Sequence, residues 1–438
     1  MSKKNLFENA VTNIDDAYIA DAMADAKRKI KTKVLFTAAA AVIAATILIL
    51  TGVAAANSYI EEAELIRPEE ESEKTGRYMP VMGTYMSQKS EIVIDMETGE
   101  PIFTCRAKDG DGYAGDVCLD MFEKYDVTFI DCTDEYIAFI ARYIYDRGTK
   151  NYNYKESGVR LYVYDIETKE LTQTYVIGDD DVWYLKCVGD HVLFGTGEMR
   201  YLYKYNIKTQ RVLTVLDKRK NPEVNFCCVD EETGEFVYRL SQYYASWFGP
   251  EDTYYITNKG KFDWSKKLLT PDWKQYALTM TGSGYFEKYG SNSPAVFDYH
   301  TGKTTEMKAD SGGHYIAKHG DTYCFTTNKD FVYYTEACLD EAAVEAVKQK
   351  IYVVSEDGSS EIYEMTSDFY VSVVGKYKDN VLLYPNYYRD GDVLKFAPGD
   401  GYGRVWLNLK TGDMTAYKST PDGMILERQK IVIEKKTV

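Results

Sequence analysis

Short apolar runs separated by polar turns fill the chain from Tyr78 to Val438. Within many of these runs apolar and polar residues alternate, which is the pattern of a strand with one covered face and one solvated face. One stretch, residues 336–350, reads instead as a helix. The pattern predicts an all-β domain over residues 78–438, built from many short strands.

A motif recurs along this region: two or three apolar positions, then Asp or Asn, an apolar residue, any residue, and Thr. Five clear copies have their Thr at Thr98, Thr168, Thr209, Thr301 and Thr411, and two degenerate copies have Thr257 with Gly260 and Ser355 with Gly358. The average step is about 52 residues, close to the period of propeller blades. The copies therefore predict seven structural units.

The side chains of this motif predict a turn. An Asx side chain accepts hydrogen bonds from turn amides, Thr does so more weakly, and Gly supplies a positive φ, so each copy is expected to join two strands of a hairpin. One unit shows four strand patterns in succession, at residues 181–188, 191–196, 201–206 and 211–216. We therefore expect a β-propeller of about seven four-stranded antiparallel blades.

These repeats resemble the broad class of bacterial extracytoplasmic propellers, without the Trp-Asp signature of WD repeats or the double glycine of kelch repeats. The first unit shows three strand patterns, at residues 80–86, 91–95 and 101–105, and residues 424–438 follow the last turn without a blade of their own. We expect this tail to supply the missing inner strand of the first unit, because closing the ring removes exposed sheet edges. The first strand is then the second of its blade.

The long insertions of the repeats are expected on one rim. With the strands of a blade called A to D, the B–C and D–A connections share one rim, and the A–B and C–D turns share the other. Insertions fall between B and C at residues 142–158, 242–253, 336–350 and 385–403, and between D and A at residues 106–124. Loops on a rigid scaffold commonly carry binding. The expected ligand-binding residues are the aromatics of these loops: Tyr143, Tyr145, Tyr152, Tyr154, Trp247, Phe248, Tyr387 and Tyr388. The alternative is that these rings pack on one another to order the loops.

The first 77 residues differ in character from the rest. Residues 34–56 carry no charge and are long enough to span a bilayer as a helix, which predicts a transmembrane segment. Basic residues precede this segment and a Glu-rich linker at residues 57–77 follows it, so the positive-inside rule places the N-terminus in the cytoplasm and residues 78–438 outside the plasma membrane. A cleaved signal peptide is the alternative, but the apolar run exceeds the usual length.

The cytoplasmic head, residues 1–33, has an apolar stripe at helical spacing that includes Ile14, Tyr18, Ile19 and Met23. The stripe is expected to dock a cytoplasmic partner or to lie on the lipid headgroups. The segment resembles the short acidic-then-basic heads of single-pass membrane proteins in Gram-positive anaerobes, some of which look like anti-sigma regulators. That resemblance implies a sigma factor as a candidate partner. The zinc-binding pattern of the anti-sigma class is missing, so no zinc is implied.

Composition narrows the partners further. Forty Tyr favour strands with one wet face, because the ring packs while the hydroxyl reaches solvent. A net charge of −16 argues against nucleic acid, whose binding rests on Lys and Arg.

Chemical motifs are sparse in this chain. The four histidines show no metal-pair spacing, and no nucleophile elbow or phosphate loop is present, so we expect no cofactor and no metal. Asp109, Asp111 and Asp120 match only three positions of a calcium loop. Cys105, Cys118 and Cys132 bracket one insertion and could include a disulfide, whereas Cys187, Cys227 and Cys324 lie in strand patterns that suit free thiols as well.

Three functions fit these features. The favoured one is a membrane-anchored extracytoplasmic propeller that binds or senses a protein, peptide or glycan and relays this to a cytoplasmic partner. The second is an anti-sigma-type transmembrane regulator. The third is a propeller glycoside hydrolase or lyase, which needs convergent carboxylates that one sequence does not single out.

Overall fold

The computed structural model describes the strands of the propeller region and the short turns that join them. The described residues are 76–81, 92–104, 125–143, 159–178, 182–197, 200–220, 222, 224–230, 233–240, 253–257, 267–271, 278–280, 285–288, 294–307, 316–326, 347–391, 393–420 and 423–437. All of them fall in the compact unit Ile66–Val438. The predicted head and membrane segment, with Ile14, Tyr18, Ile19 and Met23, lie outside the described residues. Within the described part of the chain, no helix has the length and apolar character needed to cross a bilayer.

The described strands form seven antiparallel sheets. The first sheet contains β1 (Tyr78–Val81), β2 (Ile92–Asp95) and β3 (Glu100–Thr104). The second contains β4 (Tyr125–Cys132), β5 (Tyr136–Tyr143), β6 (Val159–Asp165) and β7 (Leu171–Gly178). The third contains β8 (Val182–Val188), β9 (His191–Thr196), β10 (Tyr201–Asn206) and β11 (Arg211–Asp217). The fourth contains β12 (Val224–Val229), β13 (Phe236–Leu240) and β14 (Thr253–Thr257).

The last three sheets contain the remaining strands. The fifth contains β15 (Leu278–Met280), β16 (Tyr285–Lys288), β17 (Ala295–Asp298) and β18 (Thr304–Glu306). The sixth contains β19 (Ala317–His319), β20 (Thr322–Thr326), β21 (Val347–Ser355), β22 (Ser360–Ser367) and β29 (Val432–Thr437). The seventh contains β23 (Phe369–Tyr377), β24 (Asn380–Asp390), β25 (Val393–Phe396), β26 (Tyr402–Asn408), β27 (Asp413–Thr420) and β28 (Gly423–Lys430), and the 3-10 helix η3 (Pro398–Asp400) lies between β25 and β26.

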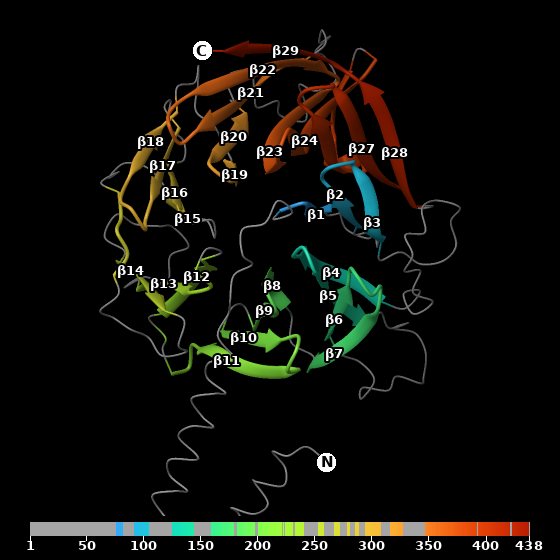
Figure 1. Ribbon diagram of the computed structural model, residues 1–438. Helices are drawn as coiled ribbons and strands as arrows, with labels where there is room; N and C mark the ends of the chain where they lie inside the picture. Colours follow the sequence, from blue (N-terminus) through green and yellow to red (C-terminus); the bar gives the residue numbers. More distant parts are fainter. Residues whose placement is uncertain are drawn as a thin grey trace, which may run out of the picture. The chain divides into compact units, whose positions relative to one another are not determined.

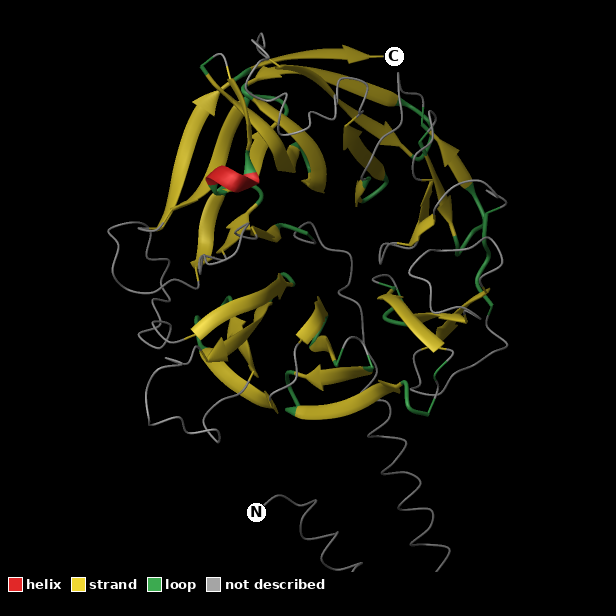
Figure 2. Ribbon diagram, turned by 180° about the vertical axis from the view of Figure 1, so that it is seen from behind, coloured by secondary structure: helices red, strands yellow, loops and turns green. Residues whose placement is uncertain are grey.

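The core of this region lies between sheets. Each hydrophobic cluster joins two neighbours in the succession: Phe103 of the first sheet packs with Phe139 of the second, and Leu193 of the third packs with Phe236 of the fourth. The series returns on itself, because Ile94 of the first sheet shares a cluster with Trp406 of the seventh. Figure 1 and, from behind, Figure 2 show this circular succession. Such an arrangement is a β-propeller.

The number of blades is at least six. The predicted number of seven stays a prediction, since the first and fourth sheets each contain three described strands instead of four. The unit chosen from the sequence as a complete blade is confirmed: its four strands, β8 to β11, pair in chain order.

The predicted Asx turns are present. In the β26–β27 turn, Oδ1 of Asn408 accepts hydrogen bonds from the backbone N–H of Thr411 at 2.9 Å and of Lys410 at 3.0 Å. The N–H of Gly412 donates to the Asn408 carbonyl at 2.9 Å, and Gly412 has φ of 75°. In the turns that begin at Asp165, Asn206 and Asp298 the side chain also accepts from the N–H three positions on, whereas Asp95 accepts from the N–H two positions on. The main-chain bond from the N–H four positions on is present in all four turns. The degenerate copy at Thr257 and Gly260 runs outside the described residues.

In several sheets a second backbone bond ties the C–D turn to the A–B turn of the same sheet. The N–H of Leu409 donates to the Asp379 carbonyl, and the N–H of Ile207 donates to the Asp190 carbonyl. In the first sheet the N–H of Met96 donates to the Arg77 carbonyl. Arg77 therefore stands where the A–B turn stands in the other sheets, and β1 has the position of a B strand, although no A strand is described beside it. We call this edge of the sheets the turn rim and the opposite edge, with the B–C connections, the insertion rim.

The predicted role of the C-terminal tail is wrong. β28 continues its own sheet as the outermost strand beside β27, and β29 adds to the outer edge of the sixth sheet beside β22. Lys435 bonds Glu361 at 2.7 Å, and Lys436 pairs with Glu364 in the same strand pair. The tail thus joins the outer edges of two neighbouring sheets instead of filling an inner position in the first.

Two insertions also differ from the prediction. The last residues of the predicted helix at 336–350 belong to β21, which begins at Val347. The insertion at residues 385–403 is not a loop throughout: β24 extends to Asp390 and pairs with β25, so Tyr387 and Tyr388 lie on a strand.

Side-chain contacts close the succession between the last and the first sheet. Nε1 of Trp406 donates to the Met96 carbonyl at 2.8 Å, and the hydroxyl of Tyr417 donates to the Gly99 carbonyl at 2.6 Å. Gly99 has φ of 72°, and a Cβ placed on it would lie 2.7 Å from Cδ2 of Trp406. A glycine is therefore required here both by the turn and by the indole that packs over it.

We predict that Gly99→Ala destabilises the domain more than Gly391→Ala. Both glycines have positive φ, 72° and 64°, but nothing lies within 4 Å of a Cβ on Gly391. The shared backbone strain costs about 1 to 2 kcal/mol, and the clash with Trp406 adds about 1 to 3 kcal/mol at Gly99 alone. Denaturant unfolding of the two variants measures the difference. Equal losses would contradict the closure of the last sheet on the first.

Candidate functional site

Two of the eight predicted ligand-binding residues can be placed with their side chains, Tyr387 and Tyr388. Tyr143 ends β5, and nothing further is described of its side chain. The other five lie outside the described residues: Tyr145, Tyr152, Tyr154, Trp247 and Phe248.

Tyr388 is part of the packing beneath the β24–β25 extension. Its ring lies 4.8 Å from that of Tyr402, and its hydroxyl donates to Asp400 at 2.8 Å. Burial, together with the bond to Asp400, raises the pKa of Tyr388 above its ordinary value. The contacts of Tyr388 therefore fit the alternative stated above, in which the aromatic rings pack within the insertions, better than they fit ligand binding.

In addition to Tyr387, the insertion rim carries two exposed aromatic side chains. The ring of Phe396 meets that of Tyr387 edge-on at 5.9 Å, and Phe396 is 48% exposed. Trp183, the second residue of the A strand β8, is 55% exposed. Because A strands start at the D–A connection, Trp183 stands on the same rim as Phe396. Trp183 lies in the strand pattern at residues 181–188 and not in an insertion, so it was not among the predicted binding residues.

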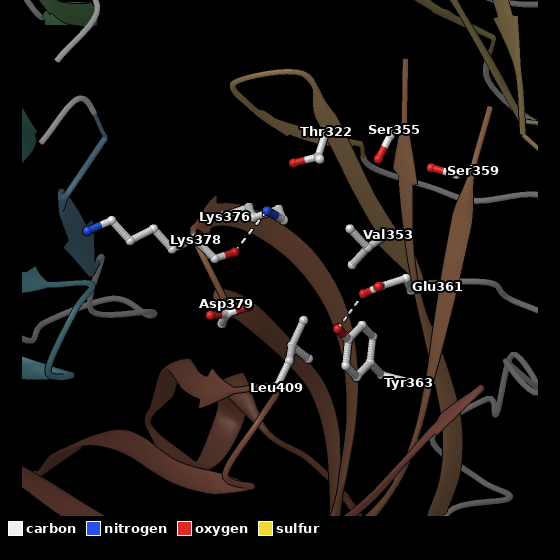
Figure 3. A pocket seen from close by; sticks show the side chains of 10 residues that line it. All are labelled: Thr322, Val353, Ser355, Ser359, Glu361, Tyr363, Lys376, Lys378, Asp379 and Leu409. Atoms are coloured by element: carbon white, nitrogen blue, oxygen red, sulfur yellow. Dashed lines mark hydrogen bonds between the residues drawn. The ribbon is translucent and has the colours of Figure 1, made fainter. Parts of the chain in front are cut away.

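A pocket of about 250 Å³ lies between the sixth and seventh sheets, on the turn rim (Figure 3). Its walls come from β20, β21 and β22 on one side, and on the other from the end of β23, the β23–β24 turn and the β26–β27 turn. The lining residues are Thr322, Val353, Ser355, Ser359, Glu361, Tyr363, Lys376, Lys378, Asp379 and Leu409. None of them was predicted.

The charged groups of this pocket differ in how they are paired. Glu361 accepts from Lys435 at 2.7 Å and from the Tyr363 hydroxyl at 2.6 Å, and these bonds lower the pKa of Glu361. Asp379 pairs with Lys410 at 2.6 Å. Lys376 is 6% exposed, and burial lowers its pKa below the ordinary value. A lysine in the otherwise apolar run of β23 was the available sequence signal.

A buried carboxylate links the fourth and fifth sheets. Asp230 is fully buried, and its Oδ2 lies 2.6 Å from the Tyr299 hydroxyl and 2.8 Å from Nε2 of His300. Its Oδ1 accepts from the N–H of Thr233 at 2.8 Å, in an Asx turn between β12 and β13. This copy of the turn motif, in an A–B position, was missed by the sequence analysis. With no solvent access, Asp230 acts as a connection between sheets.

The remaining cysteines, His191 and the aspartates of the partial calcium loop can be placed as follows. Cys132, Cys187, Cys227, Cys228 and Cys324 form no disulfide, so the suggested bridge does not involve Cys132. Burial raises the pKa of Cys324 to about 12 and lowers that of His191 to about 4. The three aspartates of the partial calcium loop, Asp109, Asp111 and Asp120, run outside the described part of the chain.

Comparison with known proteins defines a fold class and no family. No protein-family model matches the chain, and no curated protein matches it. TolB from Acinetobacter baumannii is similar over 67% of this chain and 64% of its own, with 13% identity and a TM-score of 0.36. A 6-phosphogluconolactonase-like protein from Bacteroides fragilis, described as putative, is similar over 84% of this chain and all of its own, with 11% identity and a TM-score of 0.37. The propeller domain of the trilobed protease from Pyrococcus furiosus covers 72% of this chain and 95% of its own, with 10% identity and a TM-score of 0.35. At these scores the propeller assignment rests on the sheets and their packing.

Glu287, in β16, is a titratable group in the core between the fifth and sixth sheets. It is 6% exposed, and its Oε1 accepts from the N–H of Ile316 at 3.3 Å. Burial raises the pKa of Glu287 to about 8, against the smaller opposing effect of the Ile316 bond. The folded protein therefore holds a proton on Glu287 in a pH range where the unfolded chain, with an ordinary pKa near 4.3, does not.

We predict that Glu287 makes the domain less stable as pH rises. When the folded-state pKa lies above the unfolded value, the group contributes to the free energy of unfolding. This stabilising contribution is fully present below about pH 4.3 and is lost as pH rises toward 8. Glu287→Gln should therefore gain stability relative to the parent chain between pH 5 and pH 8. Denaturant unfolding at both pH values measures this, with the exposed Glu306→Gln of the same sheet as control. A constant difference between Glu287→Gln and the parent chain would contradict the raised pKa.

Proposed function

We propose that this protein is a membrane-anchored, extracytoplasmic propeller of seven blades that binds a protein, peptide or glycan on its insertion rim. The observation that carries the binding role is the pair of exposed aromatic side chains, Trp183 at 55% and Phe396 at 48%, on the same rim of a rigid scaffold. Exposed large aromatics of this kind are frequent anchors of interfaces.

Seven blades are supported by the correspondence of one blade to each sheet. The sheets follow one another in chain order, and hydrophobic packing links each sheet to the next. On this proposal the first blade has β1 to β3 as its B, C and D strands.

The anchor rests on the uncharged segment at residues 34–56 with its basic flank before and acidic linker after. Arg77, directly before β1, lies on the turn rim. The insertion rim is the opposite edge of the sheets, so on this proposal an extracellular partner meets the protein there. Relay through the head, residues 1–33, to a cytoplasmic partner such as a sigma factor is part of the same proposal.

We predict that protease added to intact cells removes a C-terminal epitope and leaves an N-terminal epitope protected. The membrane shields only the head and the spanning segment in this topology. Immunoblots with both epitopes measure the result, and a cytoplasmic protein that stays intact controls for lysis. A soluble product that begins near Asn57 would show that residues 34–56 are a cleaved signal peptide.

We predict that replacing Trp183 and Phe396 together by Ala weakens ligand binding by about tenfold or more, because each truncation removes an exposed apolar anchor. The melting temperature should stay close to that of the parent chain, since both side chains are half-exposed. Glycan arrays and peptide libraries probed with both proteins supply the measurement.

The control for this double variant is Leu269→Ala. Leu269 is 51% exposed. Its side chain lies next to Gly302, a residue of the Asx turn that begins at Asp298, so Leu269 is on the turn rim. It should bind as the parent chain does. Equal loss of binding in the control, or no loss in the double variant, would contradict binding on the insertion rim.

A further inference from the structure

The ammonium group of Lys376 is incompletely paired inside the protein. It can donate three hydrogen bonds, and Nζ donates to the Lys378 carbonyl at 2.9 Å. In the described part of the chain no carboxylate lies within ion-pair distance of this nitrogen, although the residue is only 6% exposed. A buried charge without a counter-charge is costly, so such groups are normally paired.

The unmatched donors belong to a lysine that lines the pocket between the sixth and seventh sheets. Figure 3 shows Lys376 on the side of the pocket formed by the β23–β24 turn, and Glu361 and Tyr363 across from it. The side chain of Lys378 extends away from the other lining groups, and its Nζ lies 3.5 Å from Glu97. Lys376 is therefore the cation available to an occupant.

The remaining lining groups favour hydroxyl groups on the occupant. Glu361 and Asp379 are each paired with a lysine outside the pocket, so their charge is balanced while each carboxylate retains lone pairs that can accept further bonds. Thr322 and Ser355 add side-chain hydroxyls to the wall. A volume of about 250 Å³ equals the share of about eight water molecules in the liquid, which fits a molecule of monosaccharide size.

We propose that this pocket binds a small monocarboxylate that carries several hydroxyl groups, of the sugar-acid class. The carboxylate accepts the two unmatched hydrogen bonds of Lys376, and the hydroxyls donate to Glu361 and Asp379. One unbalanced ammonium matches one negative charge. A phosphate dianion would exceed it beside two carboxylates, a neutral sugar would leave it uncompensated, and an amino acid would bring an ammonium although both lining carboxylates are already paired with lysines.

This site is separate from the proposed binding surface. The pocket opens on the turn rim, between the β21–β22, β23–β24 and β26–β27 turns, whereas Trp183 and Phe396 stand on the insertion rim. A ligand there would bridge β22 of one sheet and β23 of the next. Binding should therefore raise the melting temperature of the chain, as any ligand specific to the folded state does.

Calorimetry and thermal unfolding of the purified full-length chain test the proposal, with galacturonate, galactose, acetate and sulfate as separate probes. We expect galacturonate to bind and to raise the melting temperature, and the other three to bind at least about tenfold more weakly. Absence of galacturonate binding would overturn the proposal. Equal binding of galactose would make the site one for neutral sugars, and equal binding of sulfate would make it a simple anion site, and both results also overturn it.

Two variants assign the contacts. Lys376→Met keeps the length of the side chain and removes the ammonium, so galacturonate affinity should fall at least about tenfold. Glu361→Gln keeps the shape and removes the acceptor charge, so affinity for galacturonate should fall while the weak binding of acetate stays unchanged; this variant tests the site even where Lys376→Met does not fold. Lys208→Met, which removes a lysine paired with Asp190 at 2.7 Å on the turn rim of the third sheet, is the control and should bind as the parent chain does. Unchanged affinity in Lys376→Met and Glu361→Gln would place galacturonate elsewhere.

Discussion

Packing between neighbouring sheets is the interaction on which the rest of this structure depends. A sheet of three to six short strands has two faces to cover, and here the neighbouring sheets cover them. Phe103 of the first sheet, for example, is fully buried with its ring 5.5 Å from that of Phe139 in the second. The loss of one such contact exposes apolar surface on two sheets at once.

Polar side chains that cross between sheets fix how the sheets are placed against each other. Asp131 of the second sheet accepts from the N–H of Cys187 in the third at 2.8 Å, and Oε1 of Gln349 in the sixth accepts from the N–H of Val371 in the seventh at 2.9 Å. Asp230 has the same role between the fourth and fifth. Because an apolar interface permits sliding and a hydrogen bond does not, these bonds define the register of neighbouring sheets.

The sequence predicts the local parts of this fold well and the long-range parts poorly. The Asx turn at Asn408 involves five consecutive residues, so their identities suffice to predict it. The partner of β29 depends on contacts with a strand about seventy residues away, such as Lys435 with Glu361, and an alternating pattern does not say which sheet edge a strand joins. The error over the tail follows from that difference.

The same distinction explains what was missed in the candidate sites. Trp183 and Lys376 each stand in a strand pattern, where a tryptophan suggests core and a lysine suggests solvent. In the folded chain the tryptophan is 55% exposed and the lysine is 6% exposed. Burial of Lys376 comes from the sixth sheet, which covers the end of β23 and which no local pattern around Lys376 encodes. Tyr388 could be placed on its insertion from the sequence, but its contact with Tyr402 depends on how β24 and β26 meet.

One hairpin connects the two proposed sites, and its structure determines how they can influence each other. β23 brings Lys376 to the turn rim, and β24 carries Tyr387 back to the insertion rim, paired with Tyr370. The pairing within this hairpin is continuous apart from one bulge in β24 and one in β23, so the hairpin moves as one body with its sheet. A ligand held between Lys376 and Glu361 acts on the contact between two sheets instead. The ligand can therefore affect the insertion rim only by rotating the sixth sheet against the seventh. The buried hydrogen bond between Gln349 and Val371 limits that rotation.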